Sequence, residues 1–143
     1  MIDLALQKWL TSHGTTANPT NGDAQNWLGW CNWVPATPNK TVLIYLEKTN
    51  FEINRSYGGA VENRIWFDIR GDSDSEAEVR NKAFEVFDAL TALQNLPNKT
   101  IILDNGTTIF ISLMNFSPPG YVGLDENLRG HWGFQAKILW SLI

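Results

Sequence analysis

Three stretches of this sequence carry side chains whose types and spacing could do chemistry. The acidic run GDSDSE, at positions 71–76, lies between a strand-like and a helix-like segment. The charged stretch DENLRGH occupies positions 125–131, and the single cysteine, Cys31, stands among tryptophans. Oxygen-rich runs can bind cations, whereas a cysteine beside a histidine can be a nucleophile. We therefore tested each stretch against the pattern that its chemistry requires.

The acidic run does not match an ion-binding loop. Counted from Asp72, a calcium loop needs glycine at its sixth position and glutamate at its twelfth, and those positions hold Ala77 and Ala83. A phosphate loop needs several glycines and a lysine, but this corner has only Gly71 and is negatively charged. A metal or phosphate site is therefore not expected here.

The same run matches the start of a helix. Ser73 and Ser75 are each followed three residues later by a glutamate, which is the capping-box pattern. Acidic residues in a first turn also suit the positive end of the helix dipole. We predict that Ser73 or Ser75 caps the helix that follows.

The stretch 125–131 has two interpretations. Asp125 and Glu126 lie beside Arg129 and His131, so a site could be formed there. The alternative is a solvated loop, or an interface loop whose charges pair across subunits. We favour the alternative.

The rest of the sequence contains no catalytic or metal-binding motif that we recognise. The chain has two histidines and one cysteine, and it lacks CxxC, HExxH and GxSxG motifs. Cys31 lies in an apolar segment, which favours a buried, inert thiol. We expect no metal, no cofactor and no enzymatic activity.

Seven tryptophans are many for this length, and Trp27, Trp30 and Trp33 recur at every third position of a tryptophan-rich segment, 26–38. They could form a stacking platform for a sugar. Burial in a core or a subunit interface is the alternative that we favour. We expect this segment to be irregular and to lie across the core.

Composition indicates one globular domain, 1–143. Apolar residues make up 43% and charged residues 18% of the 143 residues. A net charge of −4 disfavours tight, sequence-independent binding of nucleic acid. One cysteine favours a reducing compartment, and no apolar run is long enough for a membrane span. The start of the sequence has no basic region ahead of an apolar stretch, so we expect no signal peptide. We expect synthesis in the cytoplasm of the host and no membrane partner.

Hydrophobic periodicity predicts the elements. We expect a helix over 1–12, a strand over Thr41–Lys48, and a second strand over Arg64–Arg70 with Ile65, Phe67 and Ile69 facing the core. A long amphipathic helix should cover Val79–Leu93, and a hairpin should turn at Asn105–Gly106. The last strand should be Phe134–Leu142, with long loops over 49–63 and 115–132.

This order predicts an α+β fold. Helices and strands do not alternate, so we expect a mainly antiparallel, mixed sheet with both helices on one face. The sheet and its long helix should occupy positions 41–142.

Two patterns in this arrangement resemble a known family. The first is "IRGDSDSEA", which runs into the amphipathic helix, and the second is "DENLRG" before the last strand, "FQAKILW". The arrangement is similar to that of the tail terminator, or tail-to-head joining, proteins of long-tailed bacteriophages, whose relatives are often described as minor capsid proteins. The resemblance covers roughly positions 41–142.

The resemblance implies a structural protein of the virion tail or neck. Such proteins form a ring, usually a hexamer, that caps the tail tube at full length and joins it to the head connector. The implied partners are further copies of the chain, the tail tube protein and the connector or neck protein, while DNA passes through the lumen without specific binding. Two alternatives stay open: another neck or head-completion protein, and a tryptophan-rich carbohydrate-binding module.

The two predicted long loops are natural places for contacts in a ring, because long loops in compact domains are usually functional. We expect one of them to reach the tail tube or a neighbouring subunit. The candidate interface residues in and beside these loops are Asn54, Arg55, Tyr57, Arg64, Tyr121, Asp125, Glu126, Arg129 and His131.

Overall fold

The computed structural model describes residues 1–19, 27–47, 52–54, 60–73 and 75–142. In that part of the chain there are two helices, α1 (Ile2–Ser12) and α2 (Glu76–Gln94). The strands are β1 (Leu28–Cys31), β2 (Thr41–Leu46), β3 (Glu52–Asn54), β4 (Ala60–Ser73), β5 (Thr100–Ile102), β6 (Thr108–Phe116), β7 (Gly120–Leu124) and β8 (Arg129–Leu142).

All the described strands belong to one sheet of order β1-β2-β4-β8-β6-β5. Strand β3 pairs with β4, and β7 pairs with β8. The β1–β2 pair is parallel and the others are antiparallel. The predicted α+β fold, with a mainly antiparallel, mixed sheet, is confirmed.

The centre of the sheet is the long antiparallel pair of β4 and β8. Each strand has 14 residues, and their register extends from Val61 opposite Trp140 to Ser73 opposite Arg129. Side chains alternate between the two faces of a strand, so the odd-numbered residues Ile65, Phe67 and Ile69 lie together on one face and are fully buried. Their predicted orientation toward the core is confirmed.

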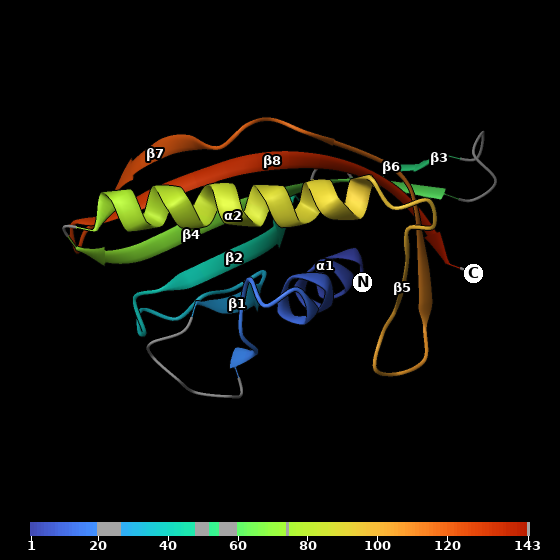
Figure 1. Ribbon diagram of the computed structural model, residues 1–143, viewed down its shortest axis with the longest axis horizontal. Coiled ribbons are helices and arrows are strands. Elements are labelled where there is room, and N and C mark those ends of the chain that lie inside the picture. The colour runs from blue at the N-terminus through green and yellow to red at the C-terminus, as the bar shows by residue number, and fades with distance from the viewer. Residues whose placement is uncertain (20–26, 48–51, 55–59, 74, 143) are drawn as a thin grey trace.

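Both helices cover that face of the sheet. Figure 1 shows α2 lying along β4 and β8, with α1 beside β2. Ile2, Leu6 and Leu10 of α1 are fully buried, as is the stripe of α2 that includes Val86 and Leu90. Complete burial of such a side chain contributes roughly 1.5–3 kcal/mol, so these stripes hold the helices in place. Neither described helix has the length and apolar character needed to cross a bilayer.

The corner between β4 and α2 is not built as predicted. Ser75 occupies the N-cap position of α2 but makes no side-chain capping bond. Its hydroxyl instead donates to the carbonyl of Asp72 at 2.6 Å, and Ser73 is the last residue of β4. The predicted N-cap position is therefore confirmed at Ser75, whereas the side-chain hydrogen bond of a capping box is absent.

Close packing explains the glycine of that corner. A Cβ atom added to Gly71 would lie 2.4 Å from Cγ2 of Val79, a fully buried residue of α2. Only glycine lets the end of β4 approach α2 so closely. The acidic run is thus a packed junction between two elements.

Two predicted loops contain strands. The predicted loop 115–132 includes β7 and the start of β8, because Gly120–Leu124 pairs with the stretch from Gly130 to Gly133. In the predicted loop 49–63, residues 52–54 form β3 and β4 already begins at Ala60. The tryptophan-rich segment, predicted to be irregular, contains β1. Short strands of this kind are held by pairing with distant residues, which local sequence patterns do not reveal.

Candidate functional site

Five charged residues gather where β4 ends and β8 begins. Asp68 and Arg70 come from β4, Arg129 and His131 come from β8, and Asp125 lies in the turn between β7 and β8. Strand register brings them together, because Arg70 lies opposite His131. We call Asp68, Arg70, Asp125, Arg129 and His131 the charged cluster.

The imidazole of His131 lies between two carboxylates. Its Nδ1 is 2.9 Å from both oxygens of Asp68, and its Nε2 is 3.0 Å from Oδ2 of Asp125. The hydrogen bond with Asp68 raises the pKa of His131, burial opposes this, and the bond with Asp125 adds to the rise. An imidazolium donates from both ring nitrogens, so it satisfies both carboxylates at once.

Asp125 is the acceptor at the centre of the turn. Its carboxylate accepts from the backbone N–H groups of Asn127 at 2.9 Å and Arg129 at 3.1 Å, and from Nε of Arg129 at 2.8 Å. Burial alone would raise the pKa of Asp125, but the hydrogen bonds from His131, Arg129 and Asn127 outweigh burial and lower it. The turn is therefore built around an ionised carboxylate.

The two arginines of the cluster bind backbone rather than solvent. Arg70 donates to the carbonyls of Pro35 at 2.8 Å, Pro38 at 2.9 Å and Asn39 at 3.1 Å. Arg129 donates to the carbonyl of Ala36 at 2.6 Å. The cluster thus fastens the segment 35–39 and the β7–β8 turn to the end of β4.

This arrangement corrects one expectation. We expected the charges of 125–131 to be solvated or to pair across subunits, but Asp125, Arg129 and His131 pair within the chain. Glu126, the fourth charged residue of this stretch, is exposed. Because both nitrogens of His131 are engaged by carboxylates, the geometry is that of a structural clamp.

The described histidine, cysteine and carboxylate side chains outside the charged cluster offer no metal site and no reactive thiol. In the described part of the chain, no group of three or more histidine, cysteine, aspartate or glutamate residues is placed to hold a metal. The Cys31 thiol is half-buried and lies 3.5 Å from the carbonyl of Asp3 and 3.6 Å from Oε1 of Gln7. Burial, and then the charge of Asp3, raise the pKa of Cys31 to about 12, as expected of an inert thiol.

The three tryptophans do not form one platform. Trp27 packs against the core, with the ammonium groups of Lys40 and Lys82 5.9 and 5.8 Å from the centre of its ring. Trp30 and Trp33 meet edge to face at 86°, and Trp33 is 65% exposed. Sugars stack on flat aromatic surfaces, and this arrangement offers no continuous one.

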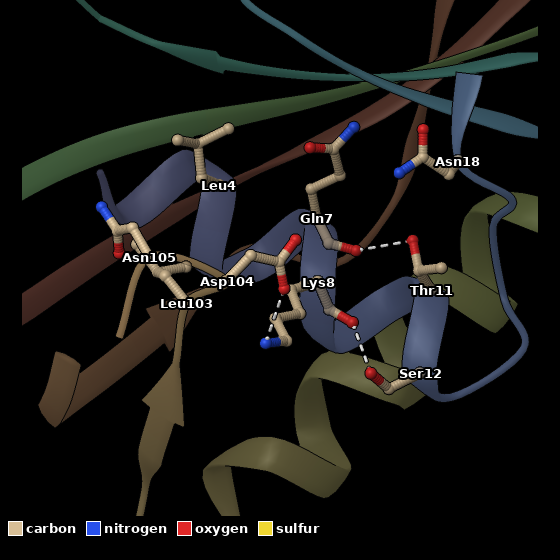
Figure 2. A pocket seen from close by; sticks show the side chains of 9 residues that line it. All are labelled: Leu4, Gln7, Lys8, Thr11, Ser12, Asn18, Leu103, Asp104 and Asn105. Atoms are coloured by element: carbon tan, nitrogen blue, oxygen red, sulfur yellow. Dashed lines mark hydrogen bonds and ion pairs between the residues drawn. The ribbon is translucent and has the colours of Figure 1, made fainter. Parts of the chain in front are cut away.

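A cleft of about 460 Å³ lies between α1 and the β5–β6 turn. Figure 2 shows the side chains that line it. Its polar groups are largely used within the chain. Lys8 pairs with Asp104 at 3.0 Å, Thr11 donates to the carbonyl of Gln7, and Ser12 donates to that of Lys8. The amide nitrogen of Gln7 points away, to the carbonyl of Gly29 at 2.6 Å. The cleft therefore presents few convergent groups to a ligand.

The face of the sheet opposite the helices is open. Tyr45 on β2 lies opposite Trp66 on β4, and Trp66 lies opposite Gln135 on β8. Arg64 and Lys137 form the next cross-strand pair. A groove of about 410 Å³ crosses this face, lined by Arg64, Asn115, Phe116, Ser117, Gln135 and Lys137. Aromatic and arginine side chains, such as Trp66 and Arg64 here, are enriched at contact surfaces.

A second exposed surface lies along β7. Tyr121, Val122, Leu124 and Leu128 are between 52% and 66% exposed. Among the described strands, β7 pairs with β8 alone, so its other edge is free. An apolar edge strand without cover is unfavourable in an isolated molecule.

The predicted interface residues separate into groups. Asp125, Arg129 and His131 join the charged cluster, Arg64 lies on the open face, and Tyr121 and Glu126 are exposed at or near β7. The backbone of Asn54 pairs with Ala60 in β3, and its side chain lies outside the described part, as do Arg55 and Tyr57.

Sequence reasoning missed three residues: Asp68 and Arg70 in the cluster, and Trp66 on the open face. The sequence signal for them is the alternation of side chains along β4. Because Ile65, Phe67 and Ile69 face the core, the even-numbered residues between and beside them must share the opposite face of the sheet.

A scan against protein-family models found no match, and a search of curated proteins found no matching sequence. The function therefore rests on the surfaces and the cluster described above.

Proposed function

We propose that this chain is a structural subunit of a bacteriophage tail that assembles into a ring, caps the tail tube and joins it to the head connector. The observation that carries the proposal is the exposed apolar surface at β7, where Tyr121, Val122 and Leu124 of the strand and Leu128 of the following turn stand exposed, and where no described strand pairs with the outer edge. Such surfaces mark protein–protein contacts.

The charged cluster supports a structural role. Asp125 and His131 use their hydrogen-bonding capacity to fix a turn, and Arg129 is 8% exposed. A subunit that must present one fixed surface to its neighbours benefits from a turn held in this way. The sequence resemblance to tail terminators supplies the specific setting, namely the virion tail or neck, with the tube and connector proteins as partners.

The experiment is assembly of tail tubes in the presence and absence of the protein. Purified tube protein growing alone should give tubes of broad length distribution. Added at one ring per tube, this protein should bind one end and stop elongation, which electron microscopy measures as a narrow length distribution and a labelled tip.

A virion assembled without the protein provides the decisive comparison. Tails of uncontrolled length support termination. Tails of normal length that fail to join heads would contradict termination and assign the protein to the neck instead.

A further inference from the structure

The turn between β7 and β8 carries a leucine in a backbone conformation that leucines rarely adopt. Leu128 has a φ of 59°, in the left-handed region, and its side chain is 66% exposed. Asparagine and glycine occupy this region far more readily than a bulky residue does. Neither burial nor backbone preference therefore explains a leucine here. A bulky side chain held at such a position points to a contact outside the chain.

Leu128 lines an apolar hollow of about 250 Å³ beside β7. Tyr121 and Leu124 also line this hollow, and both are exposed. An apolar side chain of a partner that entered the hollow would cover all three, and removal of apolar surface from water favours association. The other lining residues are Ser75, Glu76 and Gly130.

The charge beside this hollow is negative. Glu76 lines it, Glu126 lies in the same turn as Leu128, and both glutamates are exposed and have no ion pair within the described part of the chain. The N-terminus of α2 adds roughly half a positive charge, which two carboxylates exceed. Arg129 is paired with Asp125, and no lysine or arginine lines the hollow. A cation on the partner is therefore favoured at the rim.

We propose that this hollow binds a segment of a different protein in which an apolar side chain is flanked by lysine or arginine. The apolar side chain enters between Tyr121, Leu124 and Leu128, and the flanking cations pair with Glu76 and Glu126. The inference names the partner chemistry of the β7 surface and rests on the proposed function for the identity of that partner.

The acidic rim disfavours the other common partners of an apolar surface. Anionic membrane surfaces and nucleic acids carry charge of the same sign as Glu76 and Glu126, so they are repelled. A second copy of this chain supplies few cations, because most of the described lysines and arginines pair with carboxylates or carbonyls of their own chain. A basic and apolar segment of another protein is the class that remains.

Three capped peptides test this chemistry. Lys-Leu-Arg-Leu-Lys carries both features, Lys-Ser-Arg-Ser-Lys carries the charge alone, and Glu-Leu-Glu-Leu-Glu carries the opposite charge. NMR titration of the isotope-labelled protein measures the affinity and identifies the residues that respond. The first peptide should bind saturably with a Kd of about 1 mM or below and shift the amide signals of Glu76, Leu124 and Gly130. The other two should not saturate.

Leu128→Asn separates the contact from the fold. Asparagine suits a φ of 59°, so this change should leave the unfolding midpoint unchanged or raise it. It should also weaken binding of the basic apolar peptide by about fivefold or more, as loss of a contact residue does. Ile102→Asn is the matched control, because Ile102 is a 57% exposed strand residue outside the hollow, and it should leave the binding unchanged.

Glu76→Gln combined with Glu126→Gln tests the charge. This double variant should weaken binding of the same peptide by about fivefold and reduce the dependence of its affinity on salt, because two exposed ion pairs are lost. Asp88→Asn is the control, since Asp88 is an exposed carboxylate about three turns further along α2 and should not affect the binding.

Three results would overturn the inference: no saturable binding of the basic apolar peptide, equal binding of all three peptides, or a Leu128→Asn variant that binds like the wild type. If Leu128→Asn does not fold, the double glutamine variant decides instead. Light scattering tests a second copy as the occupant. Self-association of the wild type that Leu128→Asn abolishes would assign the hollow to a further copy of this chain and overturn the inference as well.

Tail tubes give a separate readout of the proposed function. Saturable binding of the peptide without capping of tubes would contradict the function and leave the binding site standing. Capping of tubes without binding of the peptide would contradict the binding site and leave the function standing.

Discussion

At the scale of single residues, His131 determines how the end of the sheet is held. It joins β8 to β4 through Asp68 and to the β7–β8 turn through Asp125, with contacts of 2.9 and 3.0 Å. A neutral imidazole has only one N–H, so it can donate to one of the two carboxylates and leaves the other facing a lone pair. The clamp therefore depends on the charge of a single side chain.

This dependence predicts how stability changes with pH. The pKa of His131 is raised in the folded protein, so its contribution is fully present below the unfolded value of about 6.5 and is lost as pH rises through the folded pKa. The pKa of Asp125 is lowered, so its contribution is present above 3.8 and is lost as pH falls. We expect His131→Asn to cost about 1.5–3 kcal/mol of unfolding free energy near pH 5–6, the usual value for hydrogen bonds to charged groups.

Urea unfolding of both proteins from pH 4 to pH 9 measures this. The difference between wild type and His131→Asn should shrink above pH 6.5. A matched change at His13, whose ring packs on that of Trp9 with 4.7 Å between ring centres, controls for the removal of an imidazole that is held by an aromatic contact. A difference that stays constant across the range would show that His131 acts through its shape rather than its charge.

Part of the clamp could be predicted from the sequence. Asp125, Arg129 and His131 lie within seven residues, so their proximity is local and was recognised. Asp68 is 63 positions from His131, and only the register of β4 against β8 brings it near. Register is set by packing of the whole sheet, which one strand does not encode.

At the scale of elements, the same distinction holds. Helix α2 was predicted because its apolar positions recur at helical spacing, and the β5–β6 hairpin because Asn105 and Gly106 favour a tight turn. Strands β7 and β1 were missed. Strand β7 has the sequence GYVGL, in which two glycines and a largely exposed surface hide the alternation that marks a strand.

The pairing of β4 with β8 gives an element-scale prediction. A Cβ atom on Gly133 would lie 2.7 Å from the backbone oxygen of Phe67, so Gly133→Ala must push the two central strands apart. We expect a loss of about 1–3 kcal/mol of unfolding free energy, as overpacking usually costs. Gly130→Ala, in the same strand, meets nothing within 4 Å and should change stability by less than about 0.5 kcal/mol. Denaturant midpoints compare the two, and equal losses would contradict the packing argument.

At the scale of the whole molecule, the sheet is covered on one side only. The helices bury the core face, while Tyr45 and Trp66 on the opposite face and Tyr121, Val122 and Leu124 on β7 are exposed. The basic groups are mostly committed inside the chain. The lysines and arginines engaged in ion pairs or bound to backbone carbonyls are Lys8, Lys40, Arg70, Lys82, Arg129 and Lys137.

The pairing of these basic groups predicts that the protein binds DNA weakly. Binding to phosphates requires free basic groups, and proteins that bind duplexes without sequence preference do so with Kd of roughly 10⁻⁴–10⁻⁶ M at physiological salt. With a net charge of −4 and most described basic groups paired, we expect no retardation of duplex DNA by about 100 µM protein at about 150 mM salt. A variant with Glu76→Lys, Asp104→Lys and Glu126→Lys should begin to retard the same DNA, which shows that the assay is sensitive enough. Retardation by the wild type that weakens steeply with added salt would contradict the proposal that DNA passes through a ring of this protein without being held.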